Sequence, residues 1–310
     1  MVDKIVVVMG PTAVGKTLMA LEIARQYAGE IISADSMQVY WGMDIGTAKP
    51  SRKVRDEIPH HLIDIIKPTE TFSVGEFKAR ARRAIQAAIE RDRLPIVVGG
   101  TNLYLHALLY DYELAEVPAD PERRCELIDY AKEHGTDRLH DWLREWDPPS
   151  AATIHPNDLQ RIVRALEVQE VTGWPMSKWK RWDEPRRVYH ALKIGLFMRR
   201  PDLYQRINRR VDWMLERGLV AEVKRLLETY GFLGPTAAQA LGYKEVLRHL
   251  EGKIDRATCR SLIQRNTRRF AKRQLTWLRK ESDVCWFDRQ DPDSRCAVLR
   301  KIDRWLKAGE

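Results

Sequence analysis

The segment GPTAVGKT, at residues 10–17, carries glycine, lysine and threonine in the spacing G-x-x-x-x-G-K-T. Glycines in such a turn allow consecutive backbone N–H groups to point inward and surround phosphate oxygens. Lys16 adds a positive charge, the hydroxyl of Thr17 can hold Mg²⁺, and a following helix would present its positive dipole end to the same anion. We therefore expect a loop that binds a diphosphate or triphosphate through Gly10, Pro11, Thr12, Ala13, Val14, Gly15, Lys16 and Thr17.

A carboxylate and a threonine follow two other segments that predict buried strands. Asp35 comes directly after the run 30–34, and Thr101 follows the apolar run 94–98 and two glycines. Because ligands bind beyond the carboxyl ends of parallel strands, we expect both side chains to lie beside the phosphate loop. There a carboxylate can hold a metal ion or accept a proton, and both roles stay open. Loops of this type usually bind ATP or GTP with an acid after a second buried strand, and here Asp35 is the nearest acid.

The elements that must position these residues follow from the hydrophobic pattern. Strands are predicted at residues 4–9, 30–34, 94–98, 189–198 and 283–288, and helices at 17–27, 79–90 and over most of 202–280. This alternation indicates an α/β fold: a parallel sheet core like that of P-loop NTPases, flanked by helices. Residues 115–183 predict helices separated by prolines. We therefore expect an all-helical insertion domain at 115–183, within a core formed by 1–114 and 184–310.

The composition excludes several classes of protein. No apolar run approaches the roughly 20 residues that cross a bilayer, and the N-terminal apolar stretch is too short for a signal peptide. The four cysteines form no CxxC pair and no zinc cluster, so we expect reduced thiols. The sequence therefore predicts a cytoplasmic protein without a membrane partner. Nothing in the sequence requires an oligomer, so we expect a monomer without an obligate protein partner.

The basic residues are concentrated near the C-terminus. The chain has 53 basic and 44 acidic residues, and residues 256–280 contain nine lysines and arginines without one acid. In a helix, one face would carry Arg265, Arg269, Lys272 and Thr276. Another face would carry three apolar residues seven positions apart, which we expect to pack on the core: Ile263, Phe270 and Trp277. A charge run is usually a solvated face, but nine cations without an acid favour contact with a phosphate backbone.

Six segments, in order along nearly the whole chain, resemble the tRNA dimethylallyltransferase family, also called tRNA isopentenyltransferases. They are GPTAVGKT at 10–17, ISADSMQVYWGMDIGTAKP at 32–50, PHHLID at 59–64, VGGTNLY at 98–104, HPNDLQRIVRALEV at 155–168 and TRRFAKRQLTWLR at 267–279. The patterns DSxxVYxGMDIGTAKP and AKRQxTWxR are the most specific. Trp41 departs from the family, where many members have a basic residue.

The resemblance implies an activity. The family transfers a dimethylallyl group from dimethylallyl diphosphate to N6 of adenosine 37, beside the anticodon of tRNAs that read UNN codons. The products are N6-isopentenyladenosine and diphosphate. Since an exocyclic amine is a poor nucleophile, it needs a base, and Asp35 resembles the family's general base. The resemblance also implies Thr17 as the ligand of a Mg²⁺ cofactor and Arg210 as a diphosphate contact, with Arg206 and Arg209 as close alternatives.

The resemblance further implies a set of tRNA contacts. The target base must flip out of its stack to react, and the residues beside its path would be Asp35, Ser36, Met37, Gln38 and Thr101. The insertion domain would grip the anticodon stem-loop through Arg124, Gln160, Arg161, Ile162, Val163 and Arg164. The basic C-terminal part of the core would bind tRNA through Arg269, Lys272 and Arg273. For His60 and His61, which fall in a family motif, we expect a structural role.

Three other functions remain as alternatives. The chain could be a small-molecule kinase or ATPase, but the strand predicted at 94–98 ends without an acid. It could prenylate free AMP, but a free nucleotide needs neither the insertion nor the basic helix. It could bind RNA without catalysis, but the intact phosphate loop, Asp35 and Arg210 count against that.

Overall fold

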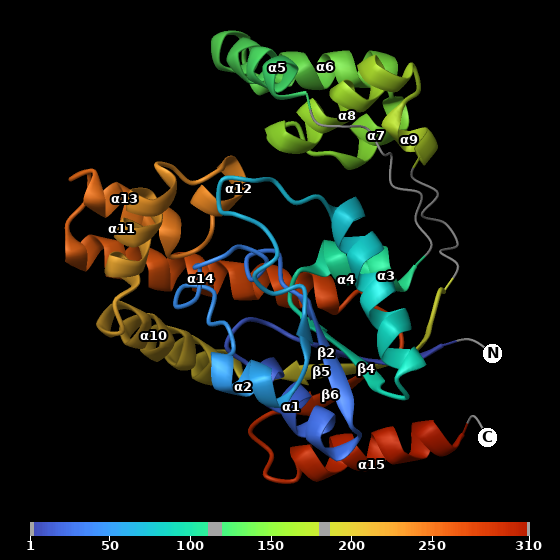
Figure 1. Ribbon diagram of the computed structural model, residues 1–310. Helices are drawn as coiled ribbons and strands as arrows, with labels where there is room; N and C mark the ends of the chain where they lie inside the picture. The colour runs from blue at the N-terminus through green and yellow to red at the C-terminus, as the bar shows by residue number, and fades with distance from the viewer. Residues whose placement is uncertain (1–2, 111–119, 180–186, 309–310) are drawn as a thin grey trace. The chain divides into compact units, whose positions relative to one another are not determined.

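The computed structural model describes residues 3–110, 120–179 and 187–308 (Figure 1). It divides into two compact units, one formed by residues 1–109 and 188–310 and the other by residues 110–187. The predicted boundaries of the insertion, at 114/115 and 183/184, lie outside the described residues.

The first unit is built on one six-stranded sheet in which every neighbouring pair is parallel. In sheet order, its strands are β3 (His60–His61), β2 (Gly29–Ala34), β4 (Leu94–Gly99), β1 (Lys4–Met9), β5 (His190–Phe197) and β6 (Val284–Asp288). Residues 5–9 of the central strand are at most 1% exposed, so both faces of the sheet are covered. The predicted α/β class with a parallel sheet is confirmed. Strand β3 was not predicted, because two residues are too few to show a period.

The register of the sheet brings several chain segments to one edge. Met9 pairs with Gly99 on one side and with Gly195 on the other, and Ala34 also pairs with Gly99. The residues that follow β1, β2 and β4 therefore leave the sheet at the same level. Asp35 is one of them, and it directly follows β2.

Helices surround this sheet, and none of those described has the length and apolar composition needed to cross a bilayer. They are α1 (Lys16–Gln26), α2 (Arg52–Glu57), α3 (Val74–Glu90), α4 (Asn102–Leu109), α10 (Arg200–Glu216), α11 (Leu219–Tyr230), α12 (Pro235–Ala238), α13 (Tyr243–Leu250), α14 (Arg256–Leu278) and α15 (Ser294–Lys307). Helix α3 begins earlier than the predicted 79–90 because Ser73 and Glu76 form a capping box at its start.

Helix α14 packs through a different face from the one predicted. Its buried residues are Cys259, Ile263, Ala271, Gln274 and Leu278. The prediction is right for Ile263 but wrong for Phe270 and Trp277, which are only half-buried. A seven-residue repeat drifts by only about 20° per repeat, so the three positions stay near one line, and the elements packed against each turn decide how far each side chain is covered. The ring of Trp277 instead makes an edge-to-face contact with the ring of His106, with the ring centroids 5.1 Å apart.

The second unit is helical over residues 120–179. Its helices are α5 (Pro121–His134), α6 (Thr136–Trp146), α7 (Pro148–Thr153), α8 (Leu159–Thr172) and α9 (Met176–Trp179). Asp120 and Asp147 cap α5 and α7, and prolines occupy the first turns, so these prolines begin helices. Buried apolar residues of α5, α6 and α8 form a core of their own.

A buried carboxylate on α11 holds the loop between β2 and α2. Glu222 is 1% exposed and accepts hydrogen bonds from the N–H groups of Asp44, Ile45 and Gly46, at 3.1, 2.8 and 3.3 Å. It also accepts a bond from the hydroxyl of Tyr243 at 2.6 Å. Burial and this carboxylate raise the pKa of Tyr243, so the phenol stays a neutral donor. The loop is thereby fixed to α11 and α13.

We expect Glu222→Ala to lower the free energy of unfolding by about 3 kcal/mol or more, since four donors would lose a charged acceptor inside the protein. Glu228→Ala, which removes an exposed carboxylate from the same helix, should change it by less than about 0.5 kcal/mol. Urea denaturation measures both variants, and equal stabilities would contradict the anchoring role of Glu222.

Candidate active site

The loop between β1 and α1 adopts a conformation that its glycines permit. Gly10 has φ +150°, and a Cβ there would lie 2.6 Å from the carbonyl oxygen of Leu196. Gly15 caps α1 in the left-handed region, with φ +106°. The side chain of Lys16 folds back over the loop and donates to the carbonyl oxygens of Gly10 and Pro11, both at 2.9 Å. The predicted strand, loop and helix are therefore present in the order that a phosphate loop requires.

Gln274 of α14 connects this loop to the end of β4. Its Oε1 accepts the N–H of Thr12 at 2.8 Å, and its Nε2 donates to the carbonyl oxygen of Gly100 at 2.8 Å. Gln274 is 4% exposed. The role of Gln274 was not predicted from the sequence, although it is the glutamine of the motif AKRQxTWxR and lies on the buried face of α14. A buried amide with both ends satisfied fixes the loop relative to the sheet edge.

Asp35 and Thr101 lie at the same edge. The Oδ1 of Asp35 accepts the N–H of Met37 at 2.9 Å, and the Oγ1 of Thr101 accepts the N–H of Ser36 at 3.1 Å. Gln38 is half-buried, and its Oε1 accepts a hydrogen bond from the hydroxyl of Ser33 at 2.9 Å. These contacts order the turn that follows β2.

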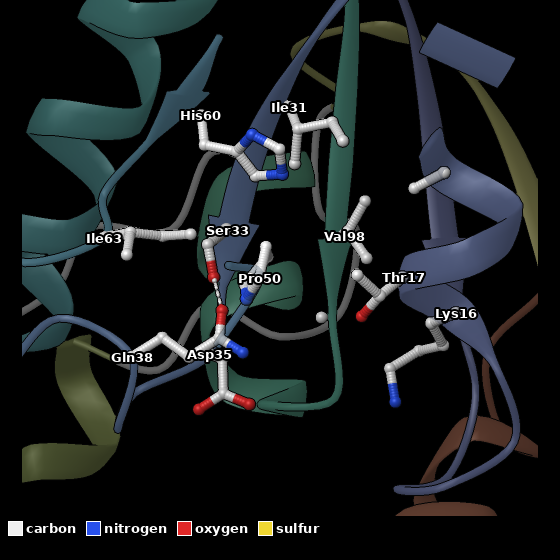
Figure 2. A pocket seen from close by; sticks show the side chains of 12 residues that line it. Lys16, Thr17, Ile31, Ser33, Asp35, Gln38, Pro50, His60, Ile63 and Val98 are labelled. Carbon is white, nitrogen blue, oxygen red and sulfur yellow. Dashed lines mark hydrogen bonds between the residues drawn. The ribbon is translucent and has the colours of Figure 1, made fainter. Parts of the chain in front are cut away.

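A pocket of about 400 Å³, including its open mouth, connects Asp35 to the start of α1. Its lining comprises Lys16, Thr17, Ala20, Ile31, Ser33, Asp35, Gln38, Pro50, His60, Ile63, Val98 and Gly99. Figure 2 shows Asp35 and Lys16 at one end, with Ile31 and His60 at the other. One end is therefore charged, whereas the walls include the apolar side chains of Ile31, Ile63 and Val98.

His60 faces this pocket as a neutral ring. Its Nδ1 lies 2.6 Å from the carbonyl oxygen of Ile58, and burial lowers the pKa of the imidazole. A neutral ring that donates Nδ1–H to Ile58 leaves Nε2 as an acceptor. Its neighbour His61 contacts Glu30 at 2.7 Å, and Glu30 also accepts two bonds from Arg91. The contact with Glu30 ties His61 to β2, and the structural role expected of both histidines stays a prediction.

Of the three candidate arginines on α10, Arg206 lies near Gly15, and Arg210 contacts the loop through Thr12. Its Nη1 lies 3.4 Å from the Oγ1 of Thr12. Burial lowers the pKa of Arg210, with Asp35 acting in the opposite direction and Arg206 adding to the lowering. Arg206 and Arg209 are exposed. Burial and the contact with Thr12 favour Arg210, and which of the three contacts the diphosphate stays a prediction.

Lys16 shares the environment of Arg210. Burial lowers the pKa of Lys16 to about 8, Asp35 opposes this shift, and Arg210 adds to it. Two cations are thus held close together with one nearby carboxylate. Such an arrangement favours the binding of an anion, which would stabilise both charged side chains.

In the second unit, the residues predicted to bind tRNA have three different environments. Arg124 donates two bonds to the buried Glu167, at 2.9 and 2.8 Å, and Arg164 donates a third at 2.5 Å. This cluster ties α5 to α8. Ile162 and Val163 are 0% and 4% exposed in the core, so the prediction that their side chains face tRNA is wrong. Gln160 and Arg161 are exposed.

The basic side chains predicted on α14 are exposed. Arg269, Lys272 and Arg273 point away from the buried face of the helix, and Arg265 does so one turn earlier. Arg273 lies over the ring of Phe270, with its Cζ 5.9 Å from the centroid. This part of α14 therefore presents a positively charged surface.

Residues 38–281 match the family model described as IPP transferase, and residues 3–60 match one described as isopentenyl transferase. The chain is 51% identical to the tRNA dimethylallyltransferase of Carboxydothermus hydrogenoformans over 289 residues, which is 93% of each chain. It is 47% identical to that of Halothermothrix orenii over 303 residues, which is 97% of this chain and 92% of the relative.

Two solved structures are similar along nearly the whole chain. The full-length tRNA isopentenylpyrophosphate transferase of Bacillus halodurans gives a TM-score of 0.73 at 43% identity, covering 99% of this chain and 97% of that one. A eukaryotic dimethylallyltransferase, captured acting on tRNA, gives a TM-score of 0.80 at 31% identity, covering 97% of this chain and 78% of that one.

The lowered pKa of Lys16 makes stability depend on pH. In the unfolded chain this amine titrates near 10.5, and in the folded protein near 8. Between these values the unfolded chain binds more protons, so stability rises with pH. From pH 8 to pH 10.5, we expect the free energy of unfolding of the unchanged protein to rise by on the order of 3 kcal/mol relative to that of Lys16→Met. Urea denaturation of both proteins across this range measures the gain, and a difference independent of pH would contradict it.

Proposed function

The chain belongs to the IPP transferase family, that of the tRNA dimethylallyltransferases, and we propose that its phosphate loop holds dimethylallyl diphosphate while the dimethylallyl group passes to tRNA. One observation supports this most: Lys16, Thr17 and Asp35 line one pocket whose walls are partly apolar. The charged end matches a diphosphate in charge, and the side chains of Ile31, Ile63 and Val98 match a branched five-carbon chain in polarity.

The leaving diphosphate would be held by three kinds of group. The backbone N–H groups of residues 13 and 15–17 would face its oxygens, whereas those of Thr12 and Val14 are already bonded to Gln274 and Pro11. Lys16, which bonds two loop carbonyls, would turn to the phosphates, and their charge would restore its ordinary pKa. Arg210 would add a guanidinium beside Thr12. Together they stabilise the negative charge that develops as the C–O bond breaks.

The oxygen groups at the loop suit Mg²⁺. Within the described residues, no group of three or more histidine, cysteine, aspartate or glutamate side chains could hold a metal. Mg²⁺ commonly keeps several waters and takes its other oxygens from substrate phosphates, so the hydroxyl of Thr17 is a sufficient protein ligand. When bound there, the ion would neutralise part of the charge on the leaving diphosphate.

Asp35 would accept the proton. As N6 of adenosine 37 attacks C1 of the dimethylallyl group, the bond between C1 and the diphosphate oxygen breaks. The N6 proton passes to Asp35 and diphosphate leaves. Met37 N–H already bonds Oδ1 and so orients the carboxylate. The turn formed by Ser36, Met37 and Gln38, with Thr101 beside it, would line the path of the flipped adenine.

The tRNA would meet two surfaces of the protein. One is the exposed face of α14 with Arg269, Lys272 and Arg273, where contact would be made to the phosphate backbone. The other belongs to the unit 110–187, for which we propose contact with the anticodon stem-loop through Arg161 and the exposed edge of Arg124. Arg164 would act mainly by tying α5 to α8 through Glu167.

We expect Asp35→Asn to reduce the rate of dimethylallyl transfer by roughly a hundredfold or more, because an amide cannot accept the proton. Binding of tRNA and of inorganic pyrophosphate should stay within about threefold of the unchanged protein, since the substitution acts on the chemical step. Single-turnover transfer from radiolabelled dimethylallyl diphosphate measures the rate. A large loss of tRNA affinity with little loss of rate would instead make Asp35 a recognition residue.

We expect the triple variant Arg269→Gln, Lys272→Gln, Arg273→Gln to bind tRNA less tightly and with a weaker dependence on salt. Loss of three phosphate contacts would reduce the slope of log affinity against log salt by about 2. Arg300→Gln, a neutral substitution of an exposed arginine on α15, is the matched control and should leave the slope unchanged. Filter binding from 50 mM to 300 mM salt measures both, and identical slopes would exclude α14 as the tRNA surface.

A further inference from the structure

Two arginines that are far apart in the sequence meet beside Gly15, where the phosphate loop enters α1. A Cβ added to Gly15 would lie 3.4 Å from Nε of Arg289 and 3.7 Å from Nη2 of Arg206. Because both atoms lie so close to one point, the two guanidinium groups are at most about 7 Å apart, a distance at which like charges repel. The glycine allows both groups to approach the loop backbone.

Two different elements bring these arginines to the loop. Arg206 lies on α10 one turn before Arg210, so both side chains leave the same face of that helix. Arg289 directly follows β6, and its N–H donates to the carbonyl oxygen of Phe197 at 2.9 Å. Since β5 and β6 are parallel to β1, Arg289 emerges at the edge of the sheet that also carries the loop. Arg289 lies beyond the residues that match either family model.

Neither arginine has a carboxylate partner among the described residues. This contrasts with arginines elsewhere in the chain. Arg91 makes two bonds to Glu30, and Arg260 makes two bonds to Asp212. Closely spaced guanidinium groups without a carboxylate between them are the arrangement that binds a phosphate group.

We propose that Arg206 and Arg289 bind the terminal phosphate of the diphosphate beside Gly15. They would form a second phosphate-binding site in addition to the loop, Lys16 and Arg210. This inference rests on the phosphate loop being the diphosphate site. A diphosphate has two phosphate groups, and one can lie in the ring of loop N–H groups while the other meets the two arginine forks. Orthophosphate has only one group and would use the loop alone. The two arginines therefore select for a diphosphate.

The test measures the binding of inorganic pyrophosphate, with Mg²⁺ present, to the full chain without tRNA. We expect Arg206→Met and Arg289→Met each to weaken binding about tenfold, as is typical when a charge-assisted contact is lost. Arg300→Met removes an exposed arginine from α15 and should change the affinity less than about twofold. Arg289→Lys keeps the charge but loses the fork, and should weaken binding at least about threefold. Isothermal titration calorimetry gives all four affinities.

The outcomes separate this inference from the proposed function. The second phosphate-binding site would be overturned if Arg206→Met and Arg289→Met kept the pyrophosphate affinity of the unchanged protein while Lys16→Met lost most of it. The loop would then remain as the diphosphate site. Undiminished binding in Lys16→Met would overturn the loop as the site. Orthophosphate provides the remaining comparison, because an equal loss of affinity for both anions in the arginine variants would exclude selection for a diphosphate.

Discussion

Positive charge held at the carboxyl edge of a parallel sheet is the constraint on which the other features of the molecule depend. Lys16 and Arg210 lie close together there, and burial lowers the pKa of each, with Asp35 acting in the opposite direction for both. Keeping two such cations near each other costs free energy in the folded protein, and a bound anion offsets that cost. The affinity of the site and the stability of the fold are therefore coupled through the same groups.

Buried polar side chains with several partners hold the surrounding loops. Gln274 joins the phosphate loop to the end of β4, Glu222 fixes residues 44–46, and Glu167 ties α5 to α8. Each of these groups is at most 4% exposed and lies far in sequence from at least one of its partners. Because an unsatisfied buried polar group is costly, each such cluster favours a single arrangement of its loop or helix pair. Rigid positioning of this kind is what a proton acceptor and a leaving group require in order to react.

The sequence patterns predicted side-chain environments poorly where all residues of a helical segment were assigned to the same surface. The segment 160–164 resembles a family motif as a whole, yet successive residues of a helix point about 100° apart, and Ile162 and Val163 fill the core while Arg161 is exposed. Phe270 and Trp277 lie near the same line of α14 as the buried Ile263, yet both are only half-buried. A motif identifies a segment, and only packing decides which of its side chains reach a ligand.

The sequence by itself determined the phosphate loop, the alternation of strands and helices, and the family, because each depends on neighbouring residues or on long matching segments. It placed Asp35 after a strand, and hence at the edge where parallel strands end. Only the tertiary structure decided that Arg210 reaches Thr12 across 198 residues and that Gln274 does so across 262. It alone brought Arg289 to Gly15. Such contacts depend on the register of the strands and the packing of α10 and α14, and no local pattern of residues encodes that geometry.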